Sequence, residues 1–182
     1  MGKATNELIH EHEAIKKVLN LLELSCKKIR SNDELDTKLL FNLIEFLKDF
    51  ADKCHHGKEE QYLFEALAQS GMSKSQGPVA VMLHEHEQGR YFIKMMSDSL
   101  SDFVNSKLLF IESAEKYIFL LRNHIEKENN ILFRMADQIL NDDIQDDLFS
   151  KFENYENEVM GKKRHEELHQ IIDSVSMKLK YS

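Results

Sequence analysis

Two ten-residue stretches of the sequence repeat one pattern of histidine, lysine, glutamate, leucine and phenylalanine. HHGKEEQYLF begins at His55 and HIEKENNILF begins at His124, and both spell His-x-x-Lys-Glu-x-x-x-Leu-Phe. Each pairs its histidine with a glutamate four residues later, at Glu59 and Glu128. Residues four apart share one face of a helix. Imidazole and carboxylate groups spaced in this way can bind one metal centre together.

A second repeated pattern surrounds two further histidines. IHEHEAIKKVL contains His12, and LHEHEQGRYFI contains His86. Each half of the chain therefore carries one HEHE and one HxxKE segment. This order indicates a helical hairpin that has been duplicated.

The phase of the apolar residues predicts which of these side chains face a core. One histidine per helix and both glutamates fall on apolar stripes. This inward set consists of His12, His55, Glu59, His86, His124 and Glu128. His10 and His84 lie off the stripes, and His56 follows charged residues, so a solvated face is expected for all three. Glu60 is expected to face solvent beside the inward Glu59. If the helical phase differed by one residue, His56 and Glu60 would face the core in place of His55 and Glu59.

A single histidine on an apolar face is usually a hydrogen-bonded core residue. Six ionisable groups aimed at one core are a different case, because two buried carboxylates without cationic partners are costly. Bound metal ions would remove this cost. The sequence therefore predicts a metal site at the six inward residues.

Long helices must position these residues. Apolar spacing predicts four helices, over about residues 5–30, 34–70, 78–105 and 107–140. Their short connections favour an all-α fold, an antiparallel up-down four-helix bundle over about 5–140. A further C-terminal helix is expected over about 144–180, with Gly161 as a point of interruption. We expect residues 1–182 to form a single domain.

Composition narrows the possible partners. The net charge is −8, from 32 acidic and 24 basic residues, which argues against nucleic acid or an anionic membrane surface as the main partner. No apolar run is long enough to span a bilayer. Two cysteines, Cys26 and Cys54, suit a reducing compartment, so we expect a cytoplasmic protein. The oligomeric state is left open.

The ordered set of motifs resembles the hemerythrin-like family, also called HHE cation-binding domains. The resemblance covers about residues 8–138 in the order His, HxxxE, His, HxxxE, and its matching residues are the six inward ones. It implies a non-haem centre of two Fe ions bridged by Glu59 and Glu128 and by an oxo or hydroxo group. Mn or Zn could substitute for the iron.

The third helix departs from the pattern of oxygen-carrying hemerythrins, which place two histidines four apart there. The positions four either side of His86 are Met82 and Arg90. We therefore expect a fifth histidine to be absent and both irons to be open, as in iron-centre repair proteins and iron-sensing domains. The resemblance implies a protein that binds or reduces a small ligand such as O₂, peroxide or NO, in defence against oxidative or nitrosative stress. A sensing module and a carrier of O₂ or iron are the alternatives, and enzymatic turnover is left open.

The segment HEELH at residues 165–169 is a literal HExxH motif of zinc proteases. Such a site needs a third ligand and a substrate cleft. We interpret His165 as a residue that packs on the bundle through its apolar neighbours, and leave open a contact with the metal site. The roles of His169 and of the two cysteines are also left open.

Overall fold

The computed structural model describes residues 2–33 and 35–181, and of residues 162, 169, 180 and 181 it describes the backbone alone. Every regular element in these residues is helical. In chain order the elements are α1 (Lys3–Arg30), α2 (Thr37–Phe46), η1 (Leu47–His56), η2 (Glu59–Leu63), α3 (Phe64–Gln69), α4 (Gly77–Ser99), η3 (Leu100–Asp102), α5 (Phe103–Lys127), η4 (Glu128–Leu132), α6 (Phe133–Ile139), α7 (Asp142–Val159) and α8 (Gly161–Tyr181).

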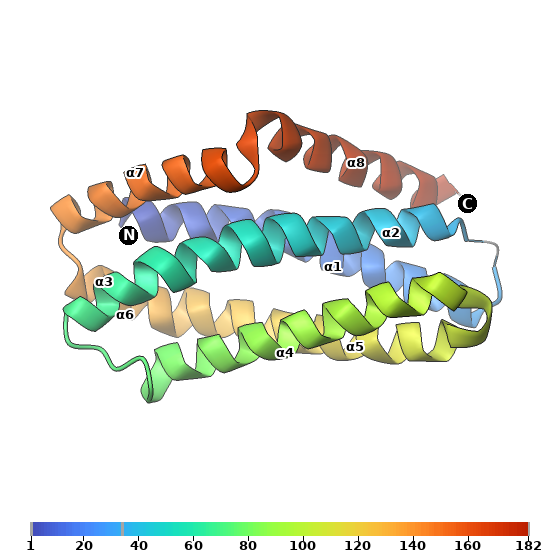
Figure 1. Ribbon diagram of the computed structural model, residues 1–182, viewed down its shortest axis with the longest axis horizontal. Coiled ribbons are helices and arrows are strands. Elements are labelled where there is room, and N and C mark those ends of the chain that lie inside the picture. Colours follow the sequence, from blue (N-terminus) through green and yellow to red (C-terminus); the bar gives the residue numbers. More distant parts are fainter. Residues whose placement is uncertain (1, 34, 182) are drawn as a thin grey trace.

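Four long rods form the bundle, and two of them are composite. The second rod runs through α2, η1, η2 and α3, and the fourth rod runs through α5, η4 and α6. The segments η1, η2 and η4 are π-helices, in which the backbone bonds five residues apart rather than four. Figure 1 shows α1, the second rod, α4 and the fourth rod lying alongside one another. The predicted all-α four-helix bundle with an additional C-terminal helix is confirmed.

Two boundaries differ from the expected ones. The turn between the third and fourth rods is the 3₁₀ segment η3, so the fourth rod begins at Phe103, earlier than expected. The C-terminal helix is divided in two at Gly161, as the sequence suggested, because this glycine takes a φ of 72° that other residues rarely adopt.

The C-terminal helices cover one side of the bundle. α7 contacts α1 and the π-helices η1 and η2, whereas α8 contacts α1 and α2. In Figure 1 they lie along the upper edge, and α4 and α5 form the opposite edge. No helix in the described part of the chain is long and apolar enough to cross a bilayer.

Two apolar clusters fill the bundle, with a polar layer between them. One cluster includes Ile15, Ala51 and Ile93, and the other includes Leu8 and Leu63. His12 lies between Leu8 and Ile15 along α1, and His55 and Glu59 lie between Ala51 and Leu63 along the second rod. The polar layer is therefore enclosed at both ends by apolar side chains.

Candidate metal centre

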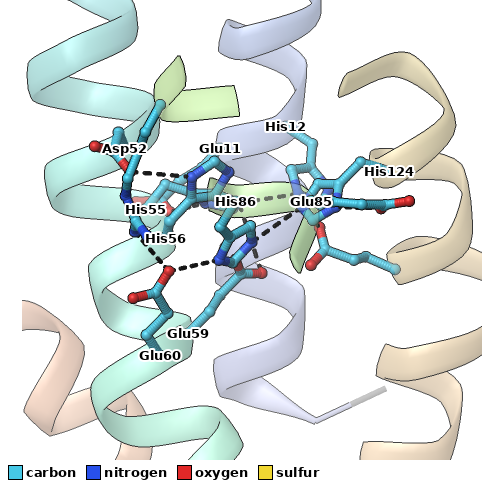
Figure 2. A network of polar contacts seen from close by, with 12 residues as sticks. Glu11, His12, Asp52, His55, His56, Glu59, Glu60, Glu85, His86 and His124 are labelled. Atoms are coloured by element: carbon cyan, nitrogen blue, oxygen red, sulfur yellow. Dashed lines mark hydrogen bonds and ion pairs between the residues drawn. The ribbon is translucent and has the colours of Figure 1, made fainter. Parts of the chain in front are cut away.

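Seven buried side chains from all four rods make up the polar layer. They are His12 from α1, His55 and His56 from η1, Glu59 from η2, His86 from α4, His124 from α5 and Glu128 from η4, each at most 3% exposed. Figure 2 shows the imidazole rings of the labelled histidines converging on the bundle interior. The structure brings all six residues of the predicted set together, and their role as metal ligands stays a prediction.

His56 corrects the sequence interpretation. We expected it on a solvated face, but it is 3% exposed and its ring stacks on that of His86 at a centroid distance of 3.9 Å. The cause is the π-helical stretch η1, whose wider turn separates neighbouring residues by a smaller angle. His55 and His56 can therefore both point inward. The expectation that a fifth histidine is absent was wrong, since it comes from the second rod and not from the third.

The first group of candidate ligands joins α1 to the two composite rods. One donor atom from each of His12, His55, Glu59 and Glu128 lies within 4.8 Å of the others. The Nε2 atoms of His12 and His55 are 3.0 Å apart. His12 Nε2 is 3.3 Å from Glu128 Oε2, and His55 Nε2 is 3.7 Å from Glu59 Oε1.

The second group lies beside the first and comprises His56, Glu59, His86 and His124. The Nε2 atoms of His86 and His124 are 3.2 Å apart. His86 Nε2 is 3.4 Å from the other oxygen of Glu59, Oε2. Glu59 thus directs one oxygen to each group, which is the geometry of a carboxylate able to bridge two ions.

Glu128 also lies between the two groups. Its Oε2 is 3.2 Å from His124 Nε2, close to its distance from His12. Both groups can share the two carboxylates, but the first group has two imidazoles, from His12 and His55, whereas the second has three, from His56, His86 and His124. The two halves of the centre are therefore unequal.

Four of the five imidazoles hydrogen-bond an oxygen through Nδ1 and direct Nε2 to the centre, whereas Nδ1 of the fifth, His56, faces Asp52 without a hydrogen bond. The Nδ1–oxygen distances are His12–Asn129 2.8 Å, His55–Glu11 2.8 Å, His86–Glu60 2.7 Å, His124–Glu85 3.0 Å and His56–Asp52 3.5 Å. Metal-binding histidines in proteins commonly hold such a partner, because it fixes the tautomer and the ring orientation. Glu60, expected in solvent, instead has this role.

Three cations compensate the outer carboxylates. Lys58 Nζ lies 2.6 Å from Glu11, and Arg90 donates to Glu60 and Asp52 at 2.6 and 2.8 Å. Lys127 donates to Glu85. Each of these cations thus lies against a carboxylate that faces an imidazole and can balance its negative charge. The His12 partner Asn129 is neutral and needs no such cation.

The central carboxylates have no donors of their own. Six buried side-chain polar atoms in the described residues lack a hydrogen-bond partner, namely His56 Nδ1, both oxygens of Glu59, both oxygens of Glu128 and Tyr117 Oη. Burying a carboxylate in this way is costly without a cation. A pair of metal ions fits this position, since it would satisfy all four carboxylate oxygens.

Electrostatics favour the metal-binding forms of Glu128 and of two histidines, whereas without a bound cation Glu59 favours its protonated form. Burial and then the charge of Glu128 raise the pKa of Glu59 well above its ordinary value. Burial acts in the same direction on Glu128, but His124 and His12 hold the pKa of Glu128 at about 2. Burial and neighbouring histidines lower the pKa of His55 and His86 well below the usual value. Both are therefore neutral imidazoles, the form that binds metals.

Other residues singled out in the sequence lie elsewhere. His10 and His84 are exposed, as expected. His165 packs against Phe50 with ring centroids 5.6 Å apart and lies 3.9 Å from Glu156, and neither group of candidate ligand atoms at the centre includes it. The side chain of His169 lies outside the described residues. The HExxH motif therefore brings no further ligand to the centre among the residues described.

Cys54 belongs to a third group of possible ligand atoms, with Glu11 and Glu156. Lys58 Nζ lies 2.6 and 2.7 Å from these two carboxylates, so a side-chain ammonium already occupies the place of a cation. Burial raises the pKa of the Cys54 thiol to about 12. This group is therefore a buried ion pair and not a second metal site.

The bundle and its site define a class of protein: a helical metal-binding domain with histidine and carboxylate donors on all four rods. Residues 3–136 match the family described as the Hemerythrin HHE cation binding domain. The chain belongs to this family, as its motifs predicted.

Similar proteins match different lengths of this chain. Proteins of Mycobacterium tuberculosis and Mycobacterium bovis described as uncharacterized are 22% identical over 166 residues, which is 87% of this chain and 63% of theirs. The iron-sulfur cluster repair protein YtfE of Musicola paradisiaca is 36% identical over 89 residues, or 45% of this chain and 40% of that protein. The chain thus spans less than two thirds of the length of these relatives. No solved structure matches it.

Proposed function

We propose that the chain is a non-haem di-iron protein that binds or reduces a small ligand such as O₂, peroxide or NO. The observation that carries this proposal is the set of four donor-free carboxylate oxygens of Glu59 and Glu128 amid five buried imidazoles. Imidazole and carboxylate donors together suit iron. When bound, the ions would supply Lewis-acid and redox chemistry.

The chain's own residues hold and shield the ions. Glu59 and Glu128 would hold both, and the outer oxygen partners fix the imidazole rings. Phe133 stacks on His12 at 5.7 Å and Phe64 stacks on His86 at 5.9 Å, which excludes water from these rings. His12 and His55 would hold one ion with one imidazole fewer than the other group offers, and this would leave more room there for an exogenous ligand.

A role in defence against oxidative or nitrosative stress, in the cytoplasm, belongs to the same proposal. It is supported by the similarity to a protein named for iron-sulfur cluster repair. Separate assays of peroxide removal, NO reduction and iron-sulfur cluster repair by the iron-loaded protein would distinguish these activities.

A metal-responsive module is the second candidate, and one contact chain favours it. Lys58 Nζ donates hydrogen bonds to Glu156 on α7 at 2.7 Å and to Glu11 at 2.6 Å. Glu11 in turn accepts the Nδ1–H of His55 at 2.8 Å. Loading at His55 is thereby connected to the packing of α7. Release of α7 on metal removal, without turnover, would favour this candidate.

Metal content after aerobic purification tests the main proposal. We expect about two irons per chain and near-ultraviolet iron absorption bands in the wild type. Glu59→Ala and Glu128→Ala should lose both, whereas the exposed Glu126→Ala, on the same rod as Glu128, should keep them. No iron in the wild type, or iron that both inward substitutions leave in place, would contradict the proposal.

A further inference from the structure

Tyr117 carries the one unpartnered buried polar atom, among the described residues, that lies outside the seven candidate ligands. The side chain is completely buried. Leaving a buried hydroxyl without a partner costs about 1–3 kcal/mol. Phenylalanine would fill nearly the same volume without that cost, so packing alone does not account for this hydroxyl.

The position of Tyr117 connects it to the metal centre. It lies on α5 two turns before His124, on the same helix face. Its Cε2 atom is 3.6 Å from the point where Gly89 would carry a Cβ, and Gly89 lies one turn after His86 on α4. A side chain at Gly89 would narrow the space beside the tyrosine ring. The ring thus lies against the turn of α4 that follows His86, and two turns before His124 along α5.

The charge around the hydroxyl decides its hydrogen-bonding role. Burial, and then the charge of Asp52, raise the pKa of Tyr117 above its ordinary value. Asp52 is the residue that faces Nδ1 of His56. The phenol therefore keeps its proton at neutral pH, and it is a donor that has no acceptor in the described part of the chain.

We propose that the Tyr117 hydroxyl donates a hydrogen bond to the small ligand held by the metal pair. This inference rests on the proposed di-iron function. It favours ligands with an electron-rich outer atom, such as azide or a hydroperoxide anion, over ligands without an acceptor. The acceptor missing from the protein is then supplied by the ligand itself.

Azide binding to the iron-loaded protein tests the inference. We expect Tyr117→Phe to keep the wild-type iron content but to bind azide about tenfold more weakly, because one hydrogen bond to a charged group is lost. The infrared antisymmetric stretch of bound azide should shift in this variant, and its shift between H₂O and D₂O should be lost. Tyr62→Phe is the control, since this half-buried ring packs near Phe152 and Tyr155 of α7 and should leave both readings unchanged.

Thermal melting of the metal-free proteins adds a second reading. Tyr117→Phe should melt no lower than the wild type, because the hydroxyl has no protein partner to lose. A lower melting temperature would overturn the inference, and so would unchanged azide affinity and stretch in a loaded variant. A wild-type protein that takes up no iron would overturn the proposed function as well, which distinguishes the two failures.

Discussion

The two copies of the His-x-x-Lys-Glu motif share the same pattern of residues, yet they contribute differently to the centre. The first lies across the π-helices η1 and η2 and presents His55, His56 and Glu59. The second begins at the end of α5, where His124 is followed by Ile125, and becomes π-helical only at η4. The first copy therefore supplies one more histidine than the second, and this histidine, His56, belongs to the group that also contains His86 and His124.

The surroundings of the two motifs differ as well. α7 packs on η1 and η2. Lys58 in the first motif is 1% exposed and lies between Glu11 and Glu156, whereas Lys127 in the second is 34% exposed and pairs with Glu85 alone. A duplicated sequence does not produce a duplicated environment, because α7 packs on the π-helices of the first copy and buries its lysine.

The largest expected difference between the two motifs is the loss of stability when the lysine of each is replaced. Lys58→Met leaves Glu11 buried without its cation, and the free energy of unfolding of the metal-free protein should fall by about 3–5 kcal/mol. Lys127→Met, at the equivalent position, should cost less than about 1 kcal/mol because its pair is partly exposed. Urea denaturation of both variants measures the contrast, and equal losses would show that burial under α7 has no energetic consequence.

The next difference concerns His56. His56→Ile gives the first motif the His–Ile pair of the second, and it removes one imidazole from the group with His86 and His124. Iron affinity at one of the two positions should fall by at least about a hundredfold, since even the outer partners of metal-binding histidines matter by 10–100-fold. Competition with a chelator measures the affinity. The exposed His10→Ile serves as control, and two irons held with wild-type affinity by His56→Ile would exclude His56 as a ligand.

A smaller difference is expected at Gly57 and at its counterpart Glu126. A side chain on Gly57 would come 2.8 Å from Tyr155 Cε1 and closer still to its hydroxyl, which bonds to Gln61 and to the carbonyl of Lys53. Gly57→Val should therefore destabilise the protein by about 2 kcal/mol through overpacking. The exposed Glu126→Val should stay within about 1 kcal/mol. Thermal unfolding compares them, and a harmless Gly57→Val would mean that α7 packs loosely on the first motif.

Apolar spacing was enough to predict the bundle and the inward direction of His12, His86 and His124, because these residues lie on regular α-helix. It failed at His56, where the backbone bonds five residues apart. The neighbouring histidines at positions 55 and 56, against His124 and Ile125 in the second copy, were the available signal. A phase calculated for an α-helix places only one residue of such a pair inside.

By itself, the sequence determined the helical periodicity, the duplicated motifs and therefore the family, since all of these are properties of spacing along one chain. Only the tertiary structure decided that Glu11, Glu60 and Glu85 hold imidazole rings from other rods, that Lys58 is buried under α7, and that Tyr117 lies beside Gly89. These contacts join residues distant in the chain. Their geometry depends on how the rods pack and on where each helix changes its hydrogen-bonding pattern. The spacing of apolar residues along the sequence specifies neither of these.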